Sequence, residues 1–254
     1  MRRPLAALIA AFPLLAWSAA APASALAGIE IVDTTQGRTL PVHEYAGRWY
    51  VAGEPGHRYE IRIRNRTADR VLAVASVDGI NVVSGETAAF DQTGYVLDPF
   101  SSLEIEGWRK SLNAVARFYF TTLPDSYAAR TGRPDEVGAI GIALFRERRQ
   151  PPRHCCDQLD SSRTQDGSAK QEQPSSAPLP ESELGTGHGE HQASSARYVD
   201  FERASDTPQE TIVIYYDSRR NLVAQGLIEP LPPNVPVANP FPGSFVQDPP
   251  RRAP

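Results

Sequence analysis

The sequence predicts an all-β fold, namely an antiparallel β-sandwich of the immunoglobulin-like or jelly-roll-like kind with one short helix. Its apolar runs are short, rich in β-branched and aromatic residues, and separated by turn residues, which is the pattern of a sandwich. Residues 59–64 alternate between apolar and charged side chains, as a half-buried strand does. Asp78-Gly79 lies between two further β-rich runs and predicts a type I′ hairpin, because that turn needs positive φ at both central residues.

The other strands of residues 28–149 follow from the same patterns. Residues 70–77 are almost wholly apolar and predict a central strand, which the hairpin connects to a strand over 80–83. Shorter runs predict strands over 95–97, 103–106, 114–121 and 137–145. Residues 125–131 alone have a helical pattern, with Asp125 as the predicted N-cap.

The second half of the chain divides into three zones. Residues 150–196 contain three large apolar residues in 47 positions, so we expect a disordered insertion that buries too little surface to fold. Residues 197–229 predict a strand over 198–201 and a hairpin of strands 211–216 and 221–228. Three strands are too few for a core of their own, so we expect them to complete one sandwich domain with residues 28–149; a separate second domain is the alternative. Residues 230–254 contain nine prolines and predict a Pro-rich disordered tail, or alternatively a polyproline ligand.

The first 27 residues are typical of a secretory signal peptide. Arg2 and Arg3 precede an uncharged run over 5–17, and small residues follow. Cleavage after Ala25 or after Ala27 fits the small-residue rule of signal peptidase. An uncleaved anchor is the alternative, but the apolar run is shorter than the roughly 20 residues that span a bilayer. We therefore expect export to the periplasm or the extracellular space, with no integral membrane segment after cleavage.

Charge and composition exclude several classes of protein. There are 26 Lys and Arg residues against 30 Asp and Glu residues, a net charge of -4, which argues against a basic nucleic-acid-binding surface. Two cysteines exclude a disulfide-dense scaffold. We expect no nucleic-acid partner and no cofactor.

Two groups of cations are candidate ligand-binding residues. Trp108, Arg109 and Lys110 place an indole beside two positive charges, a grouping that stacks on sugars or holds anions. Arg62 and Arg64 share one face of the strand 59–64. The alternatives are that Trp108 closes an edge of the sandwich beside a salt-bridged Arg109, and that the other two arginines pair with the glutamates of strand 103–106.

Five residues of the predicted insertion are candidate metal ligands: His154, Cys155, Cys156, His188 and His191. Imidazole and thiolate groups bind zinc or copper, and these residues would converge if the insertion folded back on itself. Their spacing matches no established metal motif, so exposed loop histidines are the alternative.

The sequence contains no recognisable catalytic motif, neither a G-x-S-x-G elbow nor an S-x-x-K sequence. The leading hypothesis is therefore an exported, non-enzymatic β-sandwich that acts as a binding or structural module in the periplasm or cell envelope, with an envelope protein or a glycan as its partner. One alternative is a small periplasmic hydrolase that acts on glycan or cell-wall material through acids at strand ends. Another is a metal-binding protein that uses the His/Cys-containing loop.

Three stretches resemble an uncharacterised family of exported bacterial proteins. They are residues 74–82 (VASVDGINV), residues 94–99 (GYVLDP) continuing to Gly107-Trp108-Arg109, and residues 185–189 (GTGHG). The resemblance covers most of residues 55–149 and 184–228. It implies export and one domain with a long insertion, and it implies no activity, cofactor or site residue.

Overall fold

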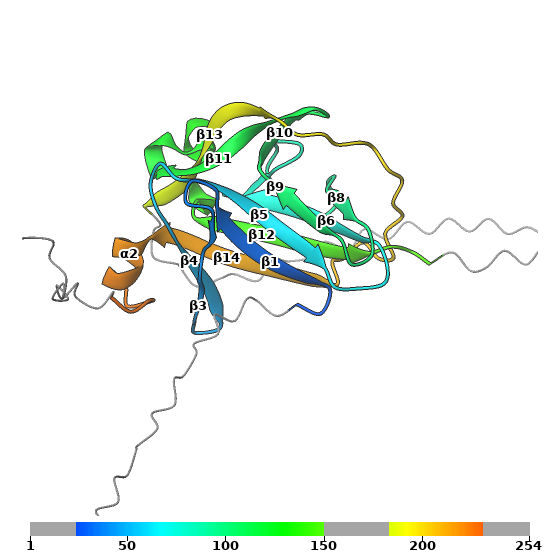
Figure 1. Cartoon of the computed structure of the whole chain (residues 1–254), viewed down its shortest axis with the longest axis horizontal. Coiled ribbons are helices and arrows are strands. Elements are labelled where there is room, and N and C mark those ends of the chain that lie inside the picture. The colour runs from blue at the N-terminus through cyan, green and yellow to red at the C-terminus, as the bar shows by residue number, and fades with distance from the viewer. Residues whose placement is uncertain (1–23, 150–182, 231–254) are drawn as a thin grey trace, which may run out of the picture.

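The computed structural model describes residues 24–149 and 183–230, which form two β-sheets packed face to face (Figure 1). The predicted all-β sandwich is confirmed. Sheet A contains β1 (Ala27–Asp33), β2 (Arg38–Thr39), β5 (Arg58–Asn65), β9 (Ser102–Ile105), β10 (Gly107–Ser111), β11 (Ala114–Thr122) and β13 (Leu184–Ala193). Sheet B contains β3 (Val42–Tyr45), β4 (Arg48–Gly53), β6 (Val71–Val77), β7 (Ile80–Asn81), β8 (Tyr95–Leu97), β12 (Ala139–Arg146) and β14 (Glu210–Ser218).

The centre of each sheet is built from strands whose inward side chains are aliphatic. In sheet A, Ile29 and Ile31 of β1 lie opposite Ile63 and Ile61 of β5, and all four side chains are fully buried. In sheet B, β12 pairs with β6 on one side and β14 on the other. The buried side chains of both sheets pack together in one shared core.

Sheet B is mixed rather than purely antiparallel. β14 runs antiparallel to β12 but parallel to β4, with Ile214 opposite Trp49. Strands that are parallel neighbours cannot be joined by a tight turn, and these two are far apart in the sequence. The expectation of an antiparallel sandwich is therefore wrong at this one pair.

Two consecutive strands of sheet A pair with different neighbours. β9 pairs with β5, and β10, which follows after Glu106, pairs with β11. At the middle of β10 the Arg109 N–H donates to the Val82 carbonyl, 2.8 Å away, so β10 reaches the residue that follows β7 of the other sheet. The two sheets are thus joined by backbone hydrogen bonding at one corner of the sandwich.

The expected insertion is wrong over residues 184–193, which form β13. This strand pairs with β11 from Leu184 opposite Thr122 to Ala193 opposite Ala114. A Cβ at Gly187 would lie 2.2 Å from Cζ of Tyr119, so the absence of a side chain there lets the Tyr119 ring lie across the strand. Gly187, which the sequence placed in a disordered insertion, is therefore a position where two strands pack closely. The rest of the insertion, residues 150–182, lies outside the described residues, as do most of the tail and the N-terminal 23 residues.

The second predicted hairpin is also wrong. After β14 the chain forms a short helix, α2 (Arg219–Ala224), instead of a strand over 221–228. The Ser218 hydroxyl caps it by accepting the Asn221 N–H at 3.2 Å, and Leu222 is buried against Tyr50 of β4. Residues 198–201 form no strand either.

Short helical turns follow β11. They are η1 (Leu123–Asp125), α1 (Tyr127–Arg130) and η2 (Pro134–Glu136). The predicted helix over 125–131 therefore exists, but its N-cap is Ser126, whose hydroxyl accepts the Ala129 N–H at 3.1 Å, and not Asp125. In the part of the chain that the structure describes, no helix is long and apolar enough to cross a bilayer.

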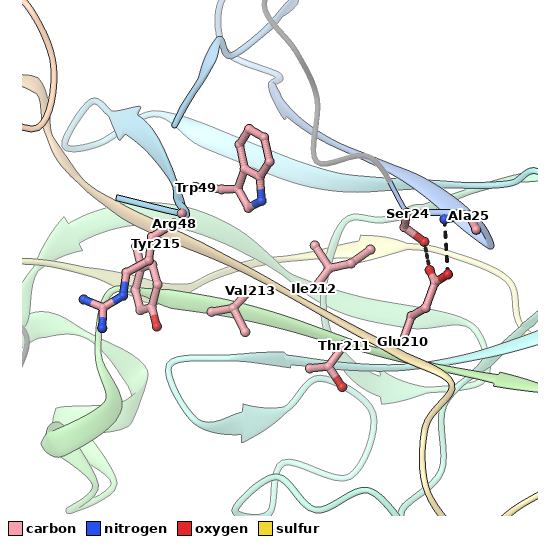
Figure 2. Close-up of a pocket in the computed structure, with 10 residues that line it drawn as sticks. Ser24, Ala25, Arg48, Trp49, Glu210, Thr211, Ile212, Val213 and Tyr215 are labelled. Carbon is pink, nitrogen blue, oxygen red and sulfur yellow. Dashed lines mark hydrogen bonds between the residues drawn. The ribbon is translucent and has the colours of Figure 1, made fainter. Parts of the chain in front are cut away.

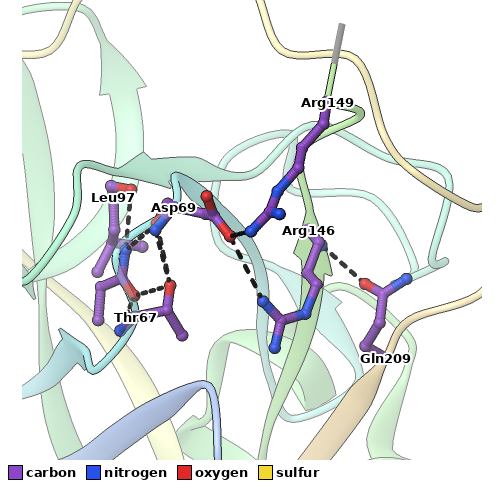
Figure 3. Close-up of polar contacts among 7 residues, drawn as sticks. Thr67, Asp69, Leu97, Arg146, Arg149 and Gln209 are labelled. Atoms are coloured by element: carbon purple, nitrogen blue, oxygen red, sulfur yellow. Dashed lines mark hydrogen bonds and ion pairs between the residues drawn. The ribbon is translucent and has the colours of Figure 1, made fainter. Parts of the chain in front are cut away.

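A buried asparagine ties the β5–β6 turn to the end of β8. The Asn65 amide donates to the Asp69 and Asp98 carbonyls at 2.8 and 2.9 Å, and its oxygen accepts the Thr67 N–H at 2.9 Å. Next to this turn, the Asp69 carboxylate pairs with Arg149 at 2.7 Å and with Arg146 at 3.8 Å (Figure 3). The turn is thereby fixed to the end of β12.

Replacing Gly187 by Ala tests the close packing of β13 on β11. We expect the new methyl group, which would overlap the Tyr119 ring, to lower the free energy of unfolding by about 2 kcal/mol, as overpacked cores do. In a Tyr119→Ala background the same substitution should cost less than about 1 kcal/mol. Urea denaturation of the four proteins measures both values, and an equal cost in the two backgrounds contradicts the packing assigned to this strand.

Candidate functional site

The Asp78-Gly79 turn and the Gly-Thr-Gly strand, which are far apart in the sequence, meet inside the sandwich. Both turn residues have positive φ, 51° at Asp78 and 70° at Gly79, which confirms the predicted hairpin geometry. The turn joins β6 to β7, with Val77 opposite Ile80. This conformation directs the Asp78 side chain inward, where only 1% of the residue is exposed.

The Asp78 carboxylate accepts three hydrogen bonds in the interior. Oδ1 accepts from the Tyr216 hydroxyl at 2.5 Å and from the Gly138 N–H at 2.9 Å. Oδ2 accepts from the Thr186 N–H at 2.8 Å. Burial raises the pKa of Asp78 to about 6, although the three donors act in the opposite direction.

A chain of hydroxyl groups continues from this carboxylate to the other sheet. The Thr186 Oγ1 lies 2.6 Å from the hydroxyls of both Tyr216 and Tyr59. Burial raises the pKa of both phenols well above 10, so each keeps its proton. Since Tyr216 donates to Asp78 and each hydroxyl has one proton, Thr186 donates to Tyr216 and Tyr59 donates to Thr186.

This buried network connects the two sheets and is closed to solvent. Tyr59 and Thr186 belong to sheet A, whereas Tyr216 belongs to sheet B and Asp78 ends one of its strands. Phe118 and Phe120 stack on Tyr59, with ring centroids 5.3 and 4.3 Å away. Because the groups are buried among aromatic rings, the network contributes to the packing of the two sheets.

One surface feature with the chemistry of a binding site is a groove of ≈ 940 Å³ beside the chain between β13 and β14. We call residues 194–209 the strap; in Figure 1 it is the yellow segment that runs along the outside of the molecule before β14. We call this groove the strap groove. Its apolar lining residues include Leu72, Val96 and Leu103.

Three arginines hold the strap in place. Arg109 of β10 donates to the Ser194 carbonyl at 2.7 Å, and Arg70 donates to the Asp200 carbonyl at 2.8 Å. Arg203 of the strap itself donates to the carbonyls of Phe90 and Gln92. The guanidinium of Arg203 also lies 4.4 Å from the centre of the Phe145 ring. These hydrogen bonds fix the strap to the sandwich and so define one side of the groove.

The groove presents aromatic faces and balanced charge. Tyr198 is 85% exposed, and the Tyr95 hydroxyl accepts a hydrogen bond from Arg109 at 3.1 Å. Four arginines and four acidic residues line it, so their charges cancel: Arg70, Arg109, Arg197, Arg203, Asp91, Asp98, Glu104 and Asp200. Such a surface suits a neutral, polar ligand with flat or hydroxyl-bearing faces.

The predicted ligand-binding residues lie in three places. Arg109 lines the strap groove, and Lys110 is exposed at the end of β10. Trp108 is 3% exposed, and its Nε1 donates to the Gly187 carbonyl at 3.2 Å. Its ring packs edge-on against Phe118 and beside Tyr127, so the indole belongs to the core in this structure.

Arg62 lies in a charge ladder on the outer face of sheet A. It pairs with Glu60 at 3.0 Å, Glu104 at 3.2 Å and Glu30 at 3.5 Å. This is the cross-strand pairing that the sequence offered as an alternative. Burial raises the pKa of Glu60, and the neighbouring Glu104 adds to this effect. Arg64 is exposed on the same face.

The predicted metal ligands are only partly within the described residues. His188 and His191 both lie on β13, with ring centroids 6.2 Å apart, and His188 packs against Tyr127. Burial lowers the pKa of His188. Residues 24–149 and 183–230 contain no group of three or more His, Cys, Asp or Glu side chains that could hold a metal ion. His154, Cys155 and Cys156 lie outside the described residues.

Sequence reasoning missed the residues that shape the groove and a further hydrogen-bonded pair of side chains. Arg70, Tyr95 and Arg203 belong to no local sequence motif, because they are far apart in the sequence and line the same groove only in the folded chain. Asp33, 2% exposed, lies 2.8 Å from Nδ1 of His57 and joins the β1–β2 turn to the start of β5. The spacing of Asp33 and His57 in the sequence does not predict this contact.

Comparison of the chain with protein-family models, with curated proteins and with solved structures gives no match.

The buried network predicts an unusual pH dependence of stability. Because the pKa of Asp78 is about 6 in the folded state and 3.8 as an ordinary carboxyl, its stabilising effect is greatest below about pH 4 and declines as pH rises to about 6. This difference between the folded and the ordinary pKa of Asp78 corresponds to about 3 kcal/mol of unfolding free energy. In Asp78→Asn the Thr186 N–H would face an amide donor, which costs about 1–3 kcal/mol at pH 7.

We therefore expect the gap in unfolding free energy between wild type and Asp78→Asn to widen between pH 7 and pH 4. Other titrating groups are common to both proteins and cancel in the difference. Urea denaturation at several pH values measures the gap, and Asp91→Asn at the exposed edge of the strap groove is the control. A gap that stays constant over this range contradicts the assigned role of Asp78.

Proposed function

We propose that this protein is an exported binding module of the periplasm or cell envelope, that it catalyses no reaction, and that its ligand is a polysaccharide of the envelope. The ligand lies in the strap groove. The observation that carries the proposal is the combination of the exposed Tyr198 ring with arginine and carboxylate side chains of balanced charge along one open groove.

The chemistry of the groove supports a sugar chain. A tyrosine ring offers an apolar face to the C–H side of a sugar ring, while its hydroxyl stays in water. Guanidinium and carboxylate groups present paired donors and acceptors that match vicinal hydroxyls. The balanced charge favours a neutral chain over a strongly anionic polymer.

The architecture supports binding. Hydrogen bonds from Arg70 and Arg109 fix the strap, so little ordering is needed when a ligand enters, and this lowers the entropic cost of association. Asp78, whose pKa of about 6 would suit a general acid, is buried behind three donors and lies outside the groove. It therefore has no access to a bound sugar.

Titration with neutral oligosaccharides of β-1,4-linked N-acetylglucosamine, monitored by calorimetry, tests the proposal. We expect saturable binding that Tyr198→Ala weakens about fivefold, since loss of one stacked ring costs about 1 kcal/mol. Tyr45→Ala, which removes a tyrosine that is 49% exposed on β3, is the matched control and should bind like wild type. Absence of binding, or equal affinity of the Tyr198 and Tyr45 variants, contradicts the proposal.

A further inference from the structure

Among the described residues, burial begins at Leu26. Leu26 and Ala27 are each 1% exposed and belong to the core, whereas Ala25 is exposed. The Leu26 carbonyl accepts the Arg66 N–H at 2.9 Å, which extends the β1–β5 ladder by one residue. Among the residues that the structure describes, which start at Ser24, Leu26 is thus the first whose side chain is buried in the core and whose carbonyl extends the β1–β5 ladder.

The Glu210 carboxylate is aimed at the backbone on both sides of the Ala25–Leu26 peptide bond. Oε1 accepts the Ala25 N–H at 3.2 Å, and Oε2 accepts the Ser24 hydroxyl (Figure 2). Oε2 also accepts the Leu26 N–H at 3.3 Å. Glu210 is half-buried at the start of β14. Within residues 24–149 and 183–230 it has no ion pair with a Lys, Arg or His side chain.

We propose that the chain is cut between Ala25 and Leu26 and that Glu210 then binds the new α-ammonium group of Leu26. The inference rests on the export proposed above. In the cut, water adds across the peptide bond: the C–N bond breaks, Ala25 leaves as a carboxylate, and the Leu26 nitrogen becomes an ammonium. The half-buried carboxylate thereby gains the positive partner that it lacks in the uncut chain, and a charged pair of this kind is stronger than a neutral N–H contact.

The alternative cut after Ala27 conflicts with the packing. It would remove the buried Leu26 side chain and leave Glu210 without the N–H that it accepts. A cut after Ala25 has small residues, Ala23 and Ala25, at the two positions that signal peptidase reads. Arg66, which follows β5, donates to the Ser24 carbonyl at 3.3 Å and would lose that contact.

Export of the full chain in a Gram-negative host, followed by intact mass measurement and N-terminal sequencing, tests the site. We expect the exported protein to begin at Leu26. An exported protein that begins at Ser24 or Gly28 overturns the inference and leaves the proposed function standing. A chain that stays uncut in the cytoplasm overturns the proposed export as well.

Acylation of the α-amine tests the role of Glu210. The sequence has two lysines, so mass spectrometry of peptides separates the Leu26 amine from other reactive amines. We expect the amine of wild type to react about fivefold more slowly than that of Glu210→Gln, because a carboxylate partner keeps it protonated. Asp206→Asn, an exposed acid of the strap, is the matched control and should react like wild type. Equal rates for wild type and Glu210→Gln overturn the proposed pair.

Discussion

The sandwich depends on one buried carboxylate. Asp78 receives donors from β13, from β14 and from the chain that leads into β12, so it fixes three elements at a single point. An ionised carboxylate in a protein interior is costly unless its oxygens are occupied, and here each oxygen accepts at least one hydrogen bond. If any of these donors moved away, the cost of burial would rise, and this constrains how the sheets are placed on one another.

The hydroxyl chain extends this constraint across the core. Each hydroxyl has a single proton, so the donation from Tyr216 to Asp78 sets the direction of every bond back to Tyr59. The sheets are therefore related by a polar network as well as by packed apolar side chains. A network of this kind favours one arrangement over near alternatives, because a partly satisfied network is unfavourable.

The position of β13 also determines the surface. Its start is held by Asp78 through Thr186, and its end passes directly into the strap at Ser194. The strap is then held by arginines from both sheets, and the groove forms beneath it. At the other end of the strap, Glu210 begins β14 and contacts the start of β1. The buried network and the two proposed sites thus share the same stretch of chain.

The sequence predicted what local chemistry determines. The Asp78-Gly79 turn needs positive φ, and β5 shows its alternation directly, so both were predicted correctly. β13 was missed because its glycines have no side chain to show a pattern, and their role depends on the distant Tyr119 ring. The α2 region was predicted as a strand because its apolar residues suit either structure when burial is unknown. The groove joins side chains from Arg70 to Arg203, which no local pattern relates.

Native-state amide hydrogen exchange of Thr186 tests most directly whether the Asp78 network holds the sheets together. The Thr186 N–H donates to Asp78, so the account predicts that it exchanges only when the whole protein unfolds. Its exchange free energy should then equal that of the Ile61 and Ile142 amides at the centres of the two sheets. Exchange of Thr186 through a local opening, at a clearly lower free energy than those amides, would contradict the account.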